Sequence, residues 1–174
     1  MGAQWGIYPI DGVRHLMDTS DKYSVCDGKE ASMKRITVLL ADDNKVVRGE
    51  FKKILELEDD MEVVGEAKNG RLAVAMVKKL LPALVLMDVA MPLLNGLQAM
   101  REILAAVPAT KVLMLSAHSD EAYVAAATDC GAMGYLIKHT AAASVCPAIR
   151  AVVKGDTFYS PAIPNRLHRR NGKR

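Results

Sequence analysis

The stretch RITVLLADDNKVVRGEFKKILE, residues 35–56, decides the fold of this chain. It opens with a short run of mostly Val, Leu and Ile from Ile36 to Ala41, a pattern typical of a strand that is buried on both faces. Two adjacent acids, Asp42 and Asp43, end the run. Residues 45–57 then carry apolar side chains at helical spacing. A buried strand, an acidic turn and an amphipathic helix form the first βα unit of a parallel sheet.

The same strand–helix unit recurs four more times along the chain. Further strands are predicted at residues 62–67, 83–87, 111–115 and 133–137, and further helices at residues 69–80, 95–106, 119–130 and up to 153. Five strands that alternate with five helices predict an α/β fold, a doubly wound five-stranded parallel sheet flanked by five helices. Among such folds the flavodoxin-like arrangement is the natural choice.

Two helix starts depend on single residues. Ser119, which two acids follow, is the expected N-cap of the fourth helix. Pro147 would fall inside a last helix that began at Thr140, where it removes a hydrogen bond and clashes with an earlier carbonyl. The last helix is therefore either kinked, or begins late with Ser144 as its N-cap and Pro147 in its first turn. The late start is favoured.

Polar side chains follow the predicted strands at the sheet edge where doubly wound folds bind ligands. They are Asp42, Asp43, Asp88, Ser116 and Lys138. Three carboxylates at one edge repel each other unless a cation lies among them, and hard oxygen ligands suit Mg²⁺. Asp88 could then attack a phosphoryl group whose oxygens contact Lys138 and the Ser116 hydroxyl. Each acid alone could be a solvated loop residue or a helix cap, but the set as a whole argues against that alternative.

The composition limits the classes of function. The net charge of +3 arises at the end of the chain, because residues 164–174 hold five basic residues and no acidic ones, whereas residues 35–163 hold 14 basic and 15 acidic residues. This balance argues against a nucleic-acid-binding body. Three cysteines without CxxC or metal-binding spacing fit a reducing cytoplasm. No apolar run reaches the roughly 18–20 residues of a membrane span, so we expect a cytoplasmic protein without membrane contact.

Five short motifs are similar to those of one protein family. They are ADD at residues 41–43, MDVAMP at 87–92, NG at 95–96, LSA at 115–117 and GYLIK at 134–138. Together they resemble the receiver domain of bacterial two-component response regulators. The resemblance places this domain at residues 35–155. A mobile N-terminal leader is expected at residues 1–34, and a basic C-terminal linker or tail at 156–174.

The resemblance implies a role for each residue of the site. Asp88 is the phosphoacceptor, and Ser116 and Lys138 contact the phosphoryl group. Tyr135 is an aromatic switch that turns inward when Ser116 moves. The implied cofactor is Mg²⁺ or Mn²⁺, and its implied ligands are Asp42, Asp43, Asp88 and the backbone carbonyl of Ala90. The implied partner is a sensor histidine kinase, and a homodimer could form on phosphorylation.

The segment GDTFYSP at residues 155–161 narrows the resemblance to the NarL/LuxR-type subfamily. Receivers of that subfamily usually precede a helix-turn-helix output domain. The sequence ends at residue 174, which leaves no room for that domain. We therefore expect either a truncated piece or a stand-alone receiver, which would contact DNA only through the missing output domain.

Two other functions are compatible with parts of the pattern. An aspartyl-phosphate phosphatase or phosphotransferase commonly carries a second Asp two residues after the nucleophile, where this chain has Ala90. A receiver-like binding module that no longer takes phosphate would be expected to have lost Asp88, Lys138 or the acidic pair, and all are present. We therefore expect a phosphorylated signalling protein rather than an enzyme in the usual sense.

Overall fold

The computed structural model of the chain describes residues 35–117 and 120–163. The predicted leader at residues 1–34, the predicted cap Ser119 and the basic residues of the tail lie outside these ranges. Within the described ranges, no helix has the length and apolar character that crossing a bilayer requires.

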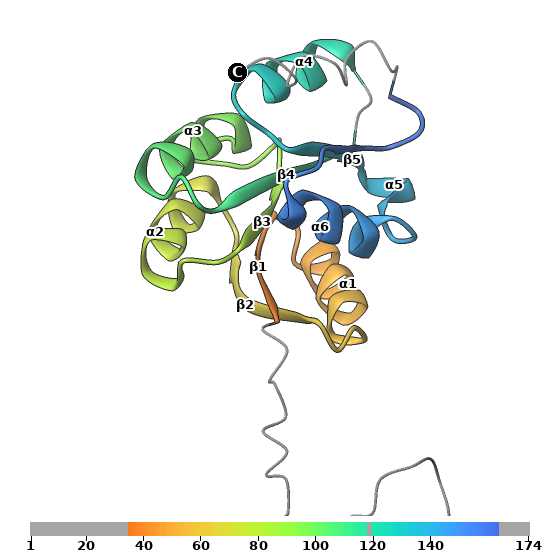
Figure 1. Cartoon of the computed structure of the whole chain (residues 1–174). Helices are drawn as coiled ribbons and strands as arrows, with labels where there is room; N and C mark the ends of the chain where they lie inside the picture. The colour runs from red at the N-terminus through yellow and green to blue at the C-terminus, as the bar shows by residue number, and fades with distance from the viewer. Residues whose placement is uncertain (1–34, 118–119, 164–174) are drawn as a thin grey trace, which may run out of the picture. The chain divides into compact units, whose positions relative to one another are not determined.

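A six-stranded parallel sheet forms the centre of the structure (Figure 1), with strand order β2-β1-β3-β4-β5-β6. The strands are β1 (Ile36–Ala41), β2 (Met61–Ala67), β3 (Leu84–Asp88), β4 (Lys111–Ser116), β5 (Gly134–Ile137) and β6 (Phe158–Tyr159). The predicted doubly wound α/β fold is confirmed, and the strand order reverses at β1, as in flavodoxin-like sheets. The sheet has one strand more than the sequence predicts.

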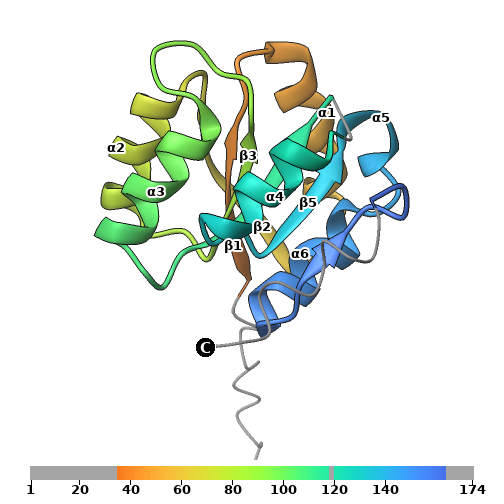
Figure 2. The same ribbon diagram turned by 90° about the horizontal axis from the view of Figure 1, so that it is seen from above.

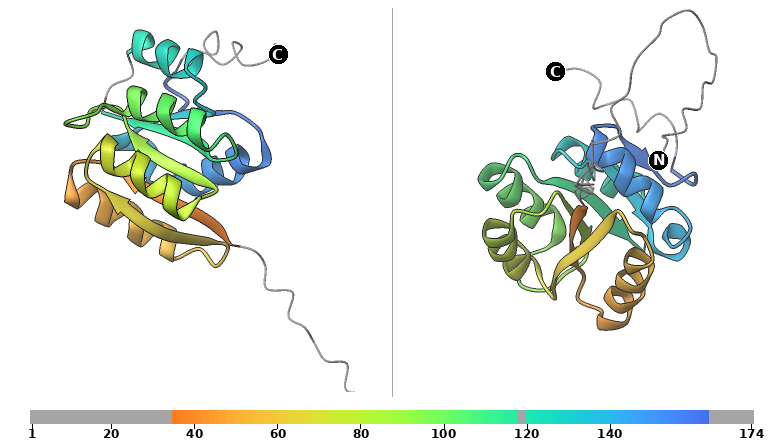
Figure 3. Two further views of the ribbon diagram at one scale, coloured as in Figure 1. Left: turned by 90° about the vertical axis from the view of Figure 1, so that its left-hand side faces the viewer. Right: turned by 60° about the horizontal axis from the view of Figure 1, so that its bottom comes forward.

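Helices cover both faces of this sheet (Figures 2 and 3). They are α1 (Lys45–Glu56), α2 (Gly70–Leu80), α3 (Gly96–Ala106), α4 (Glu121–Asp129), α5 (Lys138–Ala141) and α6 (Val145–Lys154). Helices α1 and α6 lie on one face, and α2, α3 and α4 lie side by side on the other. Each face therefore has its own apolar core.

Alternation along the strands divides the buried side chains between the two cores. In β1, Val38 and Leu40 pack under α1 and α6, whereas Leu39 and Ala41 pack under α2, α3 and α4. Aliphatic residues and methionines make up most of both cores, and Tyr135 is the largest fully buried side chain. Because both faces are covered, the strands are apolar throughout, which is the pattern that the sequence displays.

Three of the helices begin with an asparagine cap. The side chains of Asn44, Asn69 and Asn95 accept hydrogen bonds of 2.8–2.9 Å from backbone N–H groups two or three residues further on. The fourth helix differs from the prediction, because Asp120 rather than Ser119 is its cap and accepts from the backbone N–H at the second helical position. A carboxylate at this position also interacts favourably with the helix dipole.

The last helix begins late, as the position of Pro147 favours. Helix α6 starts at Val145 with Ser144 in the N-cap position, so Pro147 lies in the first turn, where its missing N–H costs no hydrogen bond. The preceding residues form the separate short helix α5. One detail of the prediction is wrong: the Ser144 side chain does not cap α6, and its hydroxyl instead donates to the carbonyl of Ala141 at 3.4 Å.

Strand β6 was not expected from the sequence. Its two residues pair with β5 in parallel, and the Tyr159 hydroxyl lies 3.2 Å from the Thr128 hydroxyl on α4. Ile163, further along, is buried in the core under α2, α3 and α4. A two-residue strand is too short to produce a periodic pattern, so only its pairing partner reveals it.

A glycine pair tests the packing around the loop that follows β3. A Cβ atom on Gly96 would lie 2.0 Å from the backbone oxygen of Asp88, whereas a Cβ atom on Gly49, inside α1, would meet nothing within 4 Å. We expect Gly96→Ala to lower the free energy of unfolding by about 1–3 kcal/mol, the range for overpacked sites. Gly49→Ala should raise it by about 0.5–1 kcal/mol, because alanine favours helix. Urea unfolding of both variants checks this, and equal effects would contradict it.

Candidate functional site

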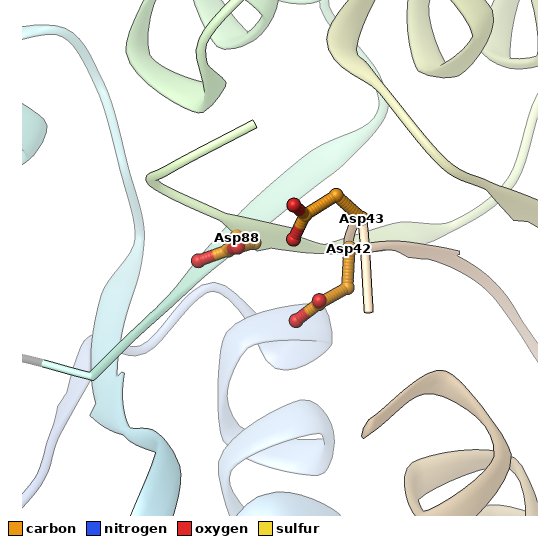
Figure 4. Close-up of side chains that lie close together, drawn as sticks. All are labelled: Asp42, Asp43 and Asp88. Carbon is orange, nitrogen blue, oxygen red and sulfur yellow. The ribbon is translucent and has the colours of Figure 1, made fainter. Parts of the chain in front are cut away.

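Three carboxylates meet at the carboxyl ends of two adjacent strands (Figure 4). Asp42 directly follows β1 and Asp88 ends β3, and the strand register pairs the residues that precede them. One oxygen atom from each of Asp42, Asp43 and Asp88 lies within 4.8 Å of the other two. Asp42 and Asp88 are only 3% and 2% exposed, whereas Asp43 faces solvent. The predicted acidic cluster is thus present, with one side open.

The ammonium group of Lys138 bridges the two buried acids. Its Nζ lies 2.7 Å from Asp42 Oδ2 and 2.9 Å from Asp88 Oδ2. Asp42 Oδ2 is buried, and the Lys138 ammonium group at 2.7 Å is the partner that compensates its charge. Lys138 is the first residue after β5, and the structure therefore brings it to the acids as predicted.

Burial and contact with an opposite charge shift the pKa of Asp88 and of Lys138 in opposite directions. Burial raises the pKa of Asp88 above its usual value, and the charge of Asp42 adds to this, while contact with Lys138 and a hydrogen bond from the Ala90 backbone N–H oppose it. Burial alone would lower the pKa of Lys138, but its contacts with Asp42 and Asp88 outweigh burial and raise it. Lys138 therefore stays charged, whereas ionisation of Asp88 is costly without a further cation.

Ser116 and Tyr135 lie next to each other beside this cluster. Ser116 ends β4 and is buried, one residue beyond the register partner of Asp88. Tyr135 on β5 is fully buried and forms a hydrogen bond with Ser116. Burial raises the pKa of the Tyr135 hydroxyl, so this group is neutral at physiological pH. The predicted switch pair is in contact, with the tyrosine turned inward.

Two residues that sequence reasoning missed hold Asp42 in place. The backbone N–H of Asn44 donates to Asp42 Oδ1 at 2.9 Å, and Arg48 Nη1 donates to the Asp42 carbonyl at 2.7 Å. Arg48 is itself held by Glu66 on β2, with 3.2 Å between Nε and Oε2. The sequence carries no signal for this arrangement, because an arginine on an exposed helix face has the same local pattern.

Ala90 lies two residues after Asp88, and the metal-binding role of its backbone carbonyl stays a prediction. Ala90 is exposed in the loop after β3, and the contact that it makes with Asp88 uses its backbone N–H. This loop turns back under Asp88, where the Gly96 N–H donates to the Val89 carbonyl at 2.9 Å. Gly96 is therefore a supporting residue of the site, because only a residue without Cβ permits so close an approach to the Asp88 backbone.

The charges of the cluster define the chemistry that it can support. With the three carboxylates ionised, the single ammonium group leaves a net charge of −2. Such a site attracts a divalent cation, and its donors are the hard oxygen atoms that Mg²⁺ prefers. A carboxylate beside a cation and a lysine can act as a nucleophile toward a phosphoryl group.

Comparison with known proteins agrees with this geometry. Residues 38–150 match the family model of the response regulator receiver domain. The transcriptional regulatory protein DegU of Brevibacillus brevis is 35% identical over 139 residues, which are 80% of this chain and 59% of that protein. The uncharacterized transcriptional regulatory protein YxjL of Bacillus subtilis is 38% identical over 125 residues, which are 72% of this chain and 57% of YxjL. The chain thus spans less than two thirds of the length of these relatives.

A solved structure extends the comparison to three dimensions. The signal receiver domain of the putative response regulator NarL from Mycobacterium tuberculosis superposes with a TM-score of 0.68 at 32% identity, covering 70% of this chain and 98% of that domain. The fold, the acidic cluster and the relatives agree. This chain belongs to the family of response regulator receiver domains, with homologues of the NarL, LuxR and DegU type.

Proposed function

We propose that Asp88 is the phosphoacceptor of this receiver domain and takes its phosphoryl group from a sensor histidine kinase. The observation that carries the proposal is the Lys138 ammonium group between the two buried carboxylates, with Asp43 beside them. Asp88 ends its strand, and its Oδ2 lies 2.9 Å from the Lys138 ammonium group. Its carboxylate would be the nucleophile, and the neighbouring positive charge of Lys138 would stabilise the phosphoryl oxygen atoms during transfer.

A divalent cation fits the residues that are present. Asp42, Asp43 and Asp88 would hold Mg²⁺ or Mn²⁺, with the backbone carbonyl of Ala90 as a further ligand. The close approach of one oxygen atom from each of the three acids and the summed charge of −2 support this assignment. When bound, the cation would neutralise the carboxylates and the oxygen atoms of the incoming phosphoryl group.

The chain's own residues would carry out the transfer. An Asp88 carboxylate oxygen forms a bond to phosphorus while the bond from phosphorus to the kinase histidine nitrogen breaks, and that nitrogen keeps the electron pair. Lys138 then pairs with one phosphoryl oxygen, and the Ser116 hydroxyl donates a hydrogen bond to another. No second acid stands at position 90 to activate water, which favours a long-lived signal over repeated turnover.

Phosphoryl transfer to Asp88 would shift the conformation of the surface formed by α4, β5 and α6. Movement of Ser116 toward the phosphoryl group stabilises the inward position of Tyr135, so phosphorylation shifts a population between two packings of the same elements. Tyr135 contacts Ser116 directly, which supports a link between the site and this surface. A homodimer formed on phosphorylation is one outcome that such a change could have.

We further propose that the domain, residues 35–155, acts in the cytoplasm as the input module of a transcription regulator. The names of DegU and YxjL identify those proteins as transcriptional regulators. Any DNA contact would be made by an output domain of the helix-turn-helix kind.

Phosphorylation of Asp88 is directly measurable. With acetyl phosphate and Mg²⁺ the chain should gain one phosphoryl group by intact-mass spectrometry, and none without a divalent cation. Asp88→Asn should remove the gain because the amide is not a nucleophile. Asp59→Asn, a change at an exposed acid away from the site, is the matched control and should leave it intact. Modification that persists in Asp88→Asn would refute the assignment.

Cation binding should appear as added stability. A ligand that binds only the folded state stabilises it by about 2.7 kcal/mol at 100 times its dissociation constant, so Mg²⁺ should raise the melting temperature measured by circular dichroism. Asp43→Asn should weaken this response because a ligand charge is lost. An equal Mg²⁺ response in Asp43→Asn and in the Asp59→Asn control would show that the ion binds elsewhere.

The raised pKa of Asp88 has a consequence for stability. The folded state holds the Asp88 proton more tightly than the unfolded state, whose carboxyl titrates near 3.8. Stability is therefore lost as pH rises from the unfolded pKa through the folded one. Without divalent cations, Asp88→Asn should stabilise the fold at pH 7 and have little effect near pH 3, since Lys138 keeps Asp42 as its partner. Urea unfolding at both pH values measures this, and a destabilised variant at pH 7 would contradict it.

A further inference from the structure

The segment after α6 forms a clamp on the outer edge of β5. Ser160 is 1% exposed, and its backbone N–H donates to the Tyr135 carbonyl at 2.9 Å. Its hydroxyl oxygen accepts a hydrogen bond of 3.0 Å from the backbone N–H of Ile137. Both contacts lie beyond the last residue of β6, at the end of β5 that faces the acidic cluster.

The Ser160 hydroxyl takes the place of a backbone carbonyl in the ladder. In a regular parallel pair the next acceptor for the Ile137 N–H would be a carbonyl of the neighbouring strand. Here the chain turns away after Ser160, and the Ser160 carbonyl accepts instead from the N–H of Ile163 at 2.8 Å. The side chain therefore extends the pairing by one step and leaves the buried Ile137 N–H satisfied.

The residue after Ile137 is Lys138, whose ammonium group must reach across the sheet. Strand β5 lies two places from β3 and three places from β1 in the strand order, yet Nζ contacts both Asp88 and Asp42. Because the Lys138 side chain already spans the distance from β5 to both acids, it can compensate little for a displacement of its own backbone. The position of the β5 end therefore determines whether the ammonium group meets its two partners.

The end of β5 has a neighbour on each side. On one side, Ile137 is in register with Ser116 of β4. On the other, its N–H is bound by the hydroxyl of Ser160, 23 residues further along the chain. Without the second contact, the strand end would keep its pairing to β4 but lose its outer support.

We propose that Ser160 is a positioning residue for phosphoryl transfer: its hydroxyl fixes the end of β5 and, through it, the location of Lys138. This inference rests on the proposed phosphorylation of Asp88. Ser160 touches neither the acids nor the phosphoryl group and acts through Lys138, so its loss should slow transfer. A displaced ammonium group would take positive charge away from Asp42 and Asp88, so cation binding should not weaken. The same contact ties the segment at residues 158–163 to the site.

The full chain with Ser160→Ala tests the proposal, with Ser160→Thr to restore the hydroxyl. The matched control is Tyr159→Phe, which removes the neighbouring hydroxyl contact with Thr128 but leaves Ser160 intact. Three quantities are measured: the maximal rate of phosphorylation by acetyl phosphate at saturating Mg²⁺, the Mg²⁺ affinity from thermal shifts, and hydrogen exchange of the Ile137 amide. Ser160→Cys, with a weaker acceptor, replaces Ser160→Ala if that variant does not fold.

We expect Ser160→Ala to lower the maximal rate by at least about threefold, below the roughly hundredfold loss that a 1 Å misplacement can cause. Mg²⁺ affinity should not fall, Ile137 exchange should be faster, and Ser160→Thr should recover most of the rate. Ser160→Cys should show a smaller loss in the same direction. A wild-type rate in Ser160→Ala, an equal loss in Tyr159→Phe, or a parallel loss of Mg²⁺ affinity would overturn the proposal. If the unsubstituted chain itself gained no phosphoryl group, the assignment of Asp88 would fail first, so the two failures are distinguishable.

Discussion

The burial of two carboxylates side by side is the constraint on which the rest of this structure depends. Asp42 and Asp88 lie together because β1 and β3 are adjacent parallel strands that end at the same edge. Burial makes ionisation of Asp88 costly, and a single ammonium group from Lys138 offsets only part of that cost. The remaining negative charge is the property that makes the site receptive to a divalent cation.

The surrounding backbone is arranged to hold these acids in place. Asn44 donates its N–H to Asp42 and caps α1 with its side chain, so one residue serves the site and the helix together. Arg48 joins the Asp42 carbonyl to Glu66 on β2. On the other side, the loop after β3 folds back under Asp88, with Gly96 at the point of closest approach. Rigid elements thus fix groups that would separate if they were free to move.

Strand β5 connects the acidic cluster with the far edge of the sheet. Tyr135 on this strand contacts Ser116, and Lys138 at its end reaches both buried acids. Strand β6 and Ser160 pair along its outer edge, and Tyr159 reaches α4 through Thr128. A displacement of β5 therefore affects the site, the tyrosine and the C-terminal segment together.

The sequence by itself determined the order of the first five strands and of the longer helices, the late start of α6 and the set of polar residues at strand ends, because periodicity, proline and strand-end position act over a few neighbouring residues. It also predicted that Asp42, Asp43, Asp88 and Lys138 meet, since parallel strands share a carboxyl edge. Only the tertiary structure decided the partners of Arg48, the tight space at Gly96 and the acceptor of the Ile137 N–H. These contacts join residues up to 23 positions apart in the sequence, which the strand order and the paths of the loops bring together. A pattern of neighbouring residues carries no information about such contacts.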